Sequence, residues 1–480
     1  MPTPPRALQA FLAVWLLQAA AYFVPGATWN PVTRLALTHA VVDEGRLQID
    51  TFADATGDRA RVGAHWYTDK SPMGSLVAVP AYALVRAVHR LSGLPPPSYE
   101  VVKATREVPA IRISPNATFT QLLFTCAVAV GALPFALLGV LLFRFLHRRF
   151  PLTSALVATV AVMMGTPLYP YATSVYGHVL AACALFAAVE LVDGSPSRSP
   201  SPARLLGAGA SLGLAVSTEF LTALPAAVLG AWTCSGAGAR QAATRAGRLV
   251  LGGALPLAVL AAYNTACFGA PWRTGYHHVV FDTFVEGHAR GLMGVGWPQA
   301  EALWGVWFSP SRGLAVVAPV SVAGVVGLVA AVRQRRSDRA LAGLCLSFLA
   351  LLLANSGYYM WWGGASAGPR HLLPVLPVLA VGVATAWEWP AARPVVTVLG
   401  VLSAAVMVLF AAVGIEAPEH GPVLTRYLFS AFSEGRLAAH AGASNLGVRL
   451  GLPVAGSLGP LLAWLLLGGR GLLKLAAARG

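Results

Sequence analysis

The sequence predicts an all-α integral membrane protein with about 12 transmembrane helices and a long first extracytoplasmic loop that contains interfacial helices. Of its 480 residues, 56% are hydrophobic and only 11% are charged, whereas soluble domains carry about 25% charged residues. Many apolar runs approach the roughly 20 residues that a helix needs to cross the bilayer core. Basic residues gather in short loops beside these runs, as the positive-inside rule requires of cytoplasmic loops.

Composition also excludes several classes of protein. The net charge of +15 does not indicate nucleic-acid binding, because most of the arginines lie beside hydrophobic helices. The five cysteines lie in apolar segments without CxxC spacing, so they are expected to be small buried hydrophobes. The abundance of Ala, Gly and Pro, with arginine in place of most lysine, favours a bacterial source and therefore the cytoplasmic (inner) membrane.

The first predicted span, residues 7–25, could also be a cleaved signal peptide, but a polytopic protein is better served by an uncleaved span. Residues 26–116 follow as a long polar-to-mixed region. Inside it, residues 74–89 are apolar but short. If they crossed the membrane, the basic cluster Arg144–Arg149 would lie outside, against the positive-inside rule. We therefore expect an interfacial helix over 74–89.

With this register both termini are cytoplasmic, and residues 1–480 form a single polytopic membrane domain. The region 205–234 is too long for one span, and Glu219 marks a break between two short helices. Spans are expected at residues 7–25, 117–143, 152–168, 178–192, 205–234 (two helices), 249–268, 302–332, 340–356, 371–389, 395–413 and 453–469. Polar extracytoplasmic loops are expected at 26–116, 269–300, 357–370 and 414–452.

The most polar stretch of the chain runs from Thr56 to Gly74. Taken singly, most charged residues of this loop are expected to form solvated ion pairs. The Asp69-Lys70 pair differs, because it precedes Pro72 and the predicted interfacial helix. Charges at such a boundary interact strongly and are costly to leave unpaired. Lysine there is suited to a lipid-linked phosphate as a point charge.

A second cluster, Tyr358–His371, occupies the predicted loop 357–370 and the residue after it. An interfacial aromatic belt explains its tyrosines and tryptophans. It does not explain the glycines that precede Arg370, which suit the approach of backbone and guanidinium to an oxyanion. His371 either orients Arg370 or is an interfacial histidine.

A third cluster lies in the loop 269–300. His277 and His278 lack a matching carboxylate and are a weak metal signal, so a substrate-shaping loop with Tyr276 is the better interpretation. His178, at the mouth of its span, is a weaker candidate for substrate binding.

These residues resemble a known family. One span, a long outer loop with the pattern R…Y-x-[DE]-K-x-P, an amphipathic helix and a span ending in basic residues are typical of the GT-C integral membrane glycosyltransferases. The chain is most similar to the branch with the aminoarabinose transferases of lipid A and the protein O-mannosyltransferases. The paired short helices around Ser217–Phe220 and the stretch GPRHLLP also resemble bacterial members. The matching residues of the loop pattern are Arg34, Tyr67, Asp69, Lys70 and Pro72.

The resemblance implies a glycosyltransferase that moves a sugar from a polyprenyl-phosphate-linked donor to a lipid, glycan or protein acceptor of the cell envelope. The site would face the periplasm or exterior. A carboxylate would deprotonate the acceptor hydroxyl, while cations stabilise the departing phosphate. A divalent metal is compatible with the family, but the sequence does not require one.

One departure from the family pattern affects the base. The family usually has an acidic residue just before the position of Arg34, and this chain has Asn30, which cannot accept a proton as a base. The resemblance therefore leaves three candidates for the catalytic base: Asp58, Asp69 and Asp50. The donor phosphate would be bound by Lys70, Arg370 and Arg34, and the substrates by Tyr67, His65, His178, Tyr276 and His371.

Two further functions remain as alternatives. A transporter is possible because the major facilitator superfamily also has twelve spans, and residues 57–61 echo its loop signature; the halves of the chain, however, show no sequence symmetry. A ligase or polymerase of lipid-linked oligosaccharides would also use outer-face arginine and histidine. Transfer of sugar would separate these enzymes from a transporter or a non-catalytic membrane protein.

Overall fold

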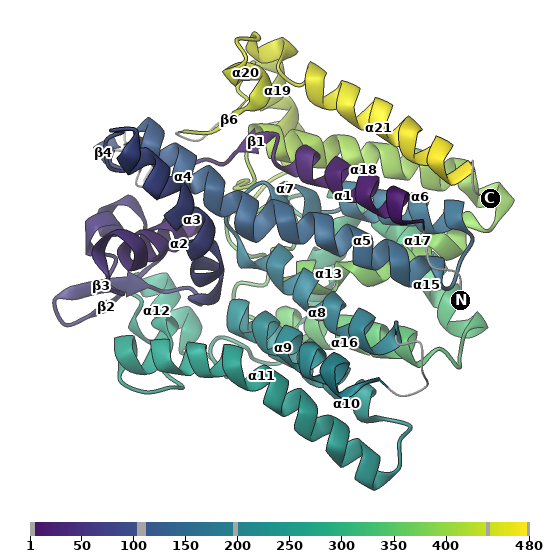
Figure 1. The fold of residues 1–480 in the computed structure, drawn as a ribbon. Helices are drawn as coiled ribbons and strands as arrows, with labels where there is room; N and C mark the ends of the chain where they lie inside the picture. The colour runs from purple at the N-terminus through teal and green to yellow at the C-terminus, as the bar shows by residue number, and fades with distance from the viewer. Residues whose placement is uncertain (1–4, 103–111, 195–199, 438–441, 478–480) are drawn as a thin grey trace.

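The molecule is an elongated helical bundle with a layer of shorter elements at one end (Figure 1). Parts of the predicted loops 26–116 and 414–452 lie outside the described residues. The computed structural model describes residues 5–102, 112–194, 200–437 and 442–477.

Most helices of the bundle follow the apolar runs of the sequence. Within the described residues, six helices are long and apolar enough to cross a membrane, and four shorter apolar helices accompany them; the number of crossings, about 12, stays a prediction. The main helices are α1 (Arg6–Ala20), α4 (Ala117–Ala127), α5 (Leu133–His147), α6 (Leu152–Gly165), α8 (Gly177–Asp193), α9 (Pro202–Thr218), α10 (Ala223–Cys234), α11 (Ala239–Phe268), α15 (Val320–Gln334), α16 (Arg339–Gly357), α17 (Leu379–Trp387), α18 (Arg393–Val413) and α21 (Gly459–Ala477).

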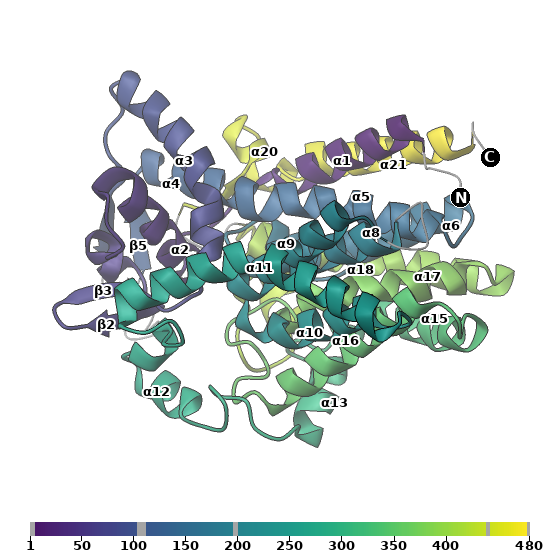
Figure 2. The ribbon, with the colours of Figure 1, turned by 60° about the horizontal axis from the view of Figure 1, so that its bottom comes forward.

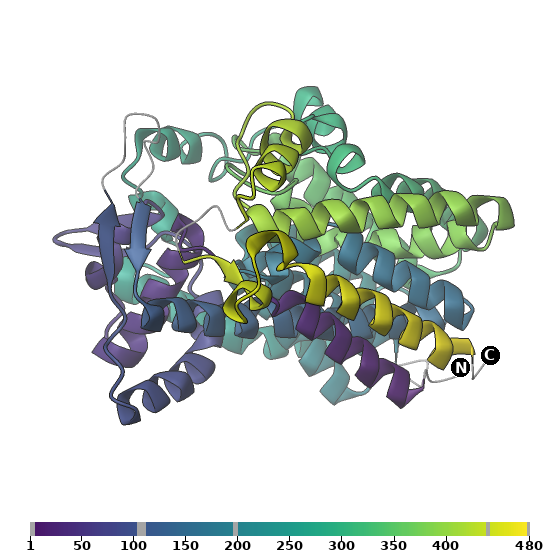
Figure 3. The same ribbon diagram turned by 90° about the horizontal axis from the view of Figure 1, so that it is seen from above.

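The two ends of the chain lie side by side. Trp15 of α1 donates its indole N–H to the carbonyl of Trp464 in α21, and Trp464 returns the same bond to Trp15, each at 3.2 Å. Strand β1 (Phe23–Val24) pairs with β6 (Ser444–Asn445). The first residues of α1 and the last of α21 therefore meet at one end of the bundle (Figure 3).

Two elements differ from a plain span. The predicted span 302–332 consists of three helices, α13 (Ala300–Phe308), α14 (Leu314–Val317) and α15. Pro310 and Pro319 stand at the two breaks, where proline cannot continue a helix. Between them Arg312 is fully buried and donates to the carbonyls of Trp362, Gly364, Pro418 and Glu419. The segment η6 (Arg370–Val378) is a 3-10 helix, as expected where Pro374 and Pro377 remove two donors.

The layer at the cavity end contains the extended elements that an all-α prediction omits. Three two-stranded antiparallel sheets occur in the described residues. β2 (Arg59–Val62) pairs with β3 (His65–Thr68), and β4 (Tyr99–Val102) pairs with β5 (Arg112–Pro115). The helices of the layer are α2 (Trp29–His39), η1 (Ala40–Glu44), η2 (Asp50–Ala55), α3 (Met73–Leu91) and α12 (Asp282–His288).

Helix α3 has the amphipathic character expected of residues 74–89. Tyr82 and Arg86 are buried against Asp43, while Leu84, Val88 and Leu91 are exposed. The helix projects from the bundle (Figure 2). Its apolar outer side is suited to the membrane surface.

At the opposite end, an ion-pair network ties α5, α8 and α16 together. Arg149 contacts Asp193 at 2.8 Å and Asp338 at 2.7 Å. Arg148 contacts Glu190 at 2.5 Å and also reaches Asp193. Arg148 and Arg149, from the loop that the sequence predicts to be cytoplasmic, therefore link α5 to α8 and α16 through ion pairs.

Candidate active site

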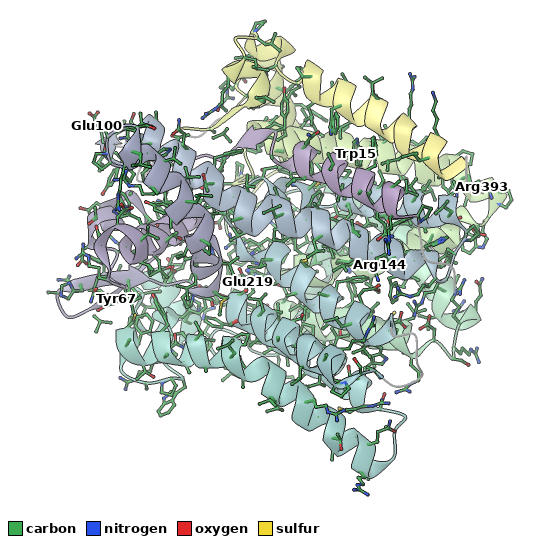
Figure 4. All side chains as sticks on the ribbon, in the orientation of Figure 1. Trp15, Tyr67, Glu100, Arg144, Glu219 and Arg393 are labelled. Carbon is green, nitrogen blue, oxygen red and sulfur yellow. The ribbon has the colours of Figure 1, made fainter. Side chains whose placement is uncertain are left out.

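A cavity of about 760 Å³ lies where the bundle meets the layer of shorter elements. Figure 4 shows Glu219 at this junction, between the ends of the long helices and α2. Three groups of charged residues and a wall of aromatic rings line the cavity. The ionisable lining residues are Arg34, Asp58, Asp69, Lys70, Tyr176, His178, Glu219, Tyr276, His288, Tyr358, Tyr359, Arg370, His371, Glu416 and Glu419.

The first group is built around Lys70, just after β3. Its Nζ lies 2.8 Å from Asp69 Oδ2 and 3.3 Å from Asp58 Oδ2. Burial raises the pKa of Asp69 to about 6, against the lowering effect of Lys70. Burial alone would lower the pKa of Lys70, but the charges of Asp58 and Asp69 outweigh it and hold the pKa above its usual value. Lys70 is thus a charged, doubly paired cation.

The second group surrounds Arg34, which α2 directs toward the break between α9 and α10. Its Nη2 lies 3.1 Å from Glu219 Oε1, and its Nε donates to Asn30 Oδ1 at 3.0 Å. Its Nη1 donates to the Ser71 carbonyl at 3.4 Å. His178 Nδ1 lies 3.5 Å from the same Glu219 oxygen.

Arg370 stands apart from the other two cations. No carboxylate lies within 4 Å of its guanidinium among the described residues, and its buried Nε has no hydrogen-bond partner there. Its guanidinium carbon lies 5.7 Å from the centre of the Tyr176 ring. Beside it, His371 Nδ1 is 2.9 Å from Asn355 Oδ1, and the His371 ring lies 6.1 Å from that of His178.

Aromatic rings form the wall that faces these charges. Tyr276 stacks on His288 with ring centres 4.3 Å apart, and Lys70 Nζ lies 5.8 Å from the Tyr276 ring. Burial raises the pKa of Tyr276 to about 12 and lowers that of His288 to about 4. Both rings are therefore neutral near pH 7. The loop that carries Tyr276 can pack closely against Asp69 because residue 275 is glycine: a Cβ added to Gly275 would lie 2.5 Å from Asp69 Cα.

Of the residues predicted from sequence, the cavity brings together Lys70, Arg370 and Arg34 with Asp58 and Asp69. It also includes three predicted substrate-binding residues, His178, Tyr276 and His371.

Three predicted residues do not line the cavity. Asp50 Oδ2 pairs with the half-exposed His65 at 2.8 Å, and Asp50 Oδ1 accepts from the Trp66 backbone. Tyr67 is buried, with its ring packed against Phe268. These side chains of η2 and β3 make their contacts within the outer layer instead.

Sequence reasoning missed three glutamates of the site. Glu416 accepts from the Tyr176 hydroxyl at 2.9 Å, and Glu419 accepts from the Trp362 indole at 2.9 Å. Nothing in the sequence around these glutamates connects them with the first loop. Glu219 did have a signal, because a lone carboxylate in an apolar stretch is a functional candidate.

The described residues contain no group of three or more His, Cys, Asp or Glu side chains that could hold a metal ion.

The fold is that of the GT-C membrane glycosyltransferases. The chain is similar to ArnT from Cupriavidus metallidurans bound to undecaprenyl phosphate, with a TM-score of 0.53 and 14% identity over 98% of this chain and 72% of that one. The apo state of the same ArnT gives the same TM-score. Archaeal oligosaccharyltransferase AglB from Archaeoglobus fulgidus, in complex with an inhibitory peptide and a dolichol-phosphate, has a TM-score of 0.45 and 12% identity over 90% and 58%. No protein-family model and no curated protein matches the sequence.

Proposed function

We propose that this protein transfers a sugar from a polyprenyl-phosphate donor to a hydroxyl group of an envelope lipid, glycan or protein at the extracytoplasmic face. The observation that carries the proposal is the unpaired guanidinium of Arg370 in the cavity. A charge removed from water without a counterion is costly, and a phosphate is the anion whose geometry arginine matches best. The fold supports the same donor, since the similar ArnT structure holds undecaprenyl phosphate.

The cavity has the parts that such a reaction needs. Arg370, with Lys70 and Arg34, stabilises the negative charge that develops on the phosphate as the glycosidic C–O bond breaks. A carboxylate of the cavity takes the proton of the acceptor hydroxyl. Asp58 and Asp69 contribute by holding Lys70 in position through their ion pairs with its ammonium group. The volume of about 760 Å³ falls within the range of small-molecule sites.

The test is transfer by purified protein in proteoliposomes. The donors are undecaprenyl phosphates that carry radiolabelled glucose, mannose or aminoarabinose, and the acceptor is an envelope extract. Wild type should transfer label. Arg370→Ala should lose about 2–4 kcal/mol of transition-state stabilisation, which lowers the rate roughly 30- to 900-fold. Arg370→Lys should recover part of the rate, because it restores charge but not the planar fork.

Arg61→Ala is the matched control, because Arg61 is exposed on the β2–β3 hairpin and lies outside the cavity lining. It should behave like wild type. Transfer that is unchanged in Arg370→Ala would contradict the proposed role of Arg370. Solute uptake without any transfer would favour a transporter.

A further inference from the structure

We propose that Glu219 is the catalytic base of this cavity, the carboxylate that takes the proton from the acceptor hydroxyl. This inference rests on the proposed function and adds the residue for the proton transfer. Asn30 is neutral and cannot perform it. Glu219 comes from a distant part of the chain and is held by the Arg34 guanidinium, which also contacts Asn30.

The position of Glu219 is set by Arg34. The guanidinium donates through Nε to Asn30 and through Nη2 to Glu219. Asn30 belongs to α2, whereas Glu219 lies at the break between α9 and α10, 185 residues after Arg34. The carboxylate that α2 itself lacks beside Arg34 is therefore supplied by this break.

The neighbouring backbone leaves room for this carboxylate. Gly177 is the first residue of α8, and a Cβ added there would lie 2.3 Å from Glu219 Oε1 and 2.9 Å from Thr218 Cγ2. A side chain at residue 177 would displace the carboxylate. The close approach of α8 to the break thus depends on glycine.

One oxygen of Glu219 is available to substrate. Oε1 lies 3.1 Å from Arg34 Nη2 and 3.5 Å from His178 Nδ1. Oε2 has no hydrogen-bond partner among the residues that the structure describes. The side chain keeps 18% of its surface exposed and lines the cavity. A hydroxyl in the cavity can therefore donate to Oε2.

The two other acidic candidates are less available. Asp58 and Asp69 share Lys70, and their side chains are 11% and 2% exposed. The Glu219 side chain, at 18% exposed, is the most accessible of the three.

Electrostatics agree with this assignment. Arg34, Arg370 and Lys70 line the same cavity as Glu219. These cations mark the place where the phosphate would lie, so the carboxylate faces the reacting centre.

The acceptor oxygen forms a bond to the anomeric carbon of the sugar, and its proton passes to Glu219 Oε2. The bond between that carbon and the phosphate oxygen breaks, and its electron pair stays on the phosphate. Polyprenyl phosphate leaves with one additional negative charge, beside Arg370.

The test compares Glu219→Gln with wild type in two measurements. Glutamine keeps the oxygen that faces Arg34 but cannot take a proton. The rate of label transfer at saturating donor should fall at least 100-fold, while the Kd for undecaprenyl phosphate, measured on the detergent-purified protein, should stay within threefold. Glu434→Gln, an exposed glutamate outside the cavity lining, should leave both unchanged.

Three outcomes would overturn the assignment. The first is a Glu219→Gln rate within threefold of wild type. The second is a loss of rate with a parallel loss of lipid binding, which would indicate a structural role. The third is Asp69→Asn showing the loss of rate at unchanged binding while Glu219→Gln does not. Failure of the wild-type protein to transfer any label would instead remove the proposed function itself, and the base with it.

Discussion

Arg370 is the cavity cation whose charge the described protein does not balance. Lys70 has two carboxylate partners and Arg34 has one, so each of these cations is largely satisfied without ligand. The Arg370 guanidinium lies over the face of Tyr176 and has no ion-pair partner among the described residues. An anionic ligand therefore gains most from Arg370, and the paired cations supply the surrounding positive field.

Asp69 should make stability depend on pH in a defined direction. Its carboxyl takes up a proton near pH 6 when folded and near 3.8 when unfolded. Between these values the folded state binds more protons, so wild type gains stability relative to Asp69→Asn as the pH falls. We expect the difference in Tm to change by roughly 2 °C between pH 7 and pH 4.

Thermal unfolding of the two detergent-purified proteins across this range measures the effect. His288 titrates in the same window with the opposite sign, because its pKa is lowered to about 4, but it is common to both proteins and cancels. A difference in Tm that stays constant, or that falls toward low pH, would contradict the expected titration of Asp69.

At the scale of elements, apolar runs predicted the helices well, because span length and loop charge are local properties of the chain. The break at Glu219 was visible for the same reason. The helix breaks beside Pro310 and Pro319 were not predicted, although proline is a local helix breaker. The burial of Arg312 between them could not be predicted, since it depends on carbonyls more than 50 residues away. Strand pairing of β1 with β6 likewise joins segments more than 400 residues apart.

The network between α5, α8 and α16 should stabilise the bundle without acting on the cavity. Arg149→Ala removes a mostly buried cation and leaves Asp193 and Asp338 without one of their partners. Breaking such a pair typically costs about 3–5 kcal/mol. We expect a clear fall in Tm, while the Kd for undecaprenyl phosphate remains that of wild type.

The exposed Arg336 provides the control for this variant, because Arg336→Ala removes a nearby charge that makes no ion pair in the described residues. Its Tm should not change. A loss of lipid affinity in Arg149→Ala would show that the far end of the bundle is coupled to the cavity.

At the scale of the whole molecule, the sequence identified the loop of Asp69 and Lys70 and the stretch of Arg370 as parts of one site. The structure places all three in the same cavity. Asp50, His65 and Tyr67 do not line it, because Asp50 pairs with His65 and the Tyr67 ring packs against Phe268. Glu416 and Glu419 could not be predicted, since only the folded bundle brings them to the first loop.

The arrangement of the chain predicts opposite sides of the membrane for two positions. The turn after α3 lies at the cavity end, and α21 ends at the other end of the bundle (Figures 1 and 3). Reporter fusions after residue 95 and after residue 480 should therefore give extracytoplasmic and cytoplasmic signals, respectively. Two signals from the same side would contradict this topology and the interfacial placement of α3.

The most direct test of the central claim is a structure of the protein in a lipid nanodisc with undecaprenyl phosphate. The phosphate group should occupy the cavity, with its oxygens about 3 Å from the guanidinium nitrogens of Arg370. A lipid phosphate bound elsewhere, with Arg370 still unpaired, would contradict it.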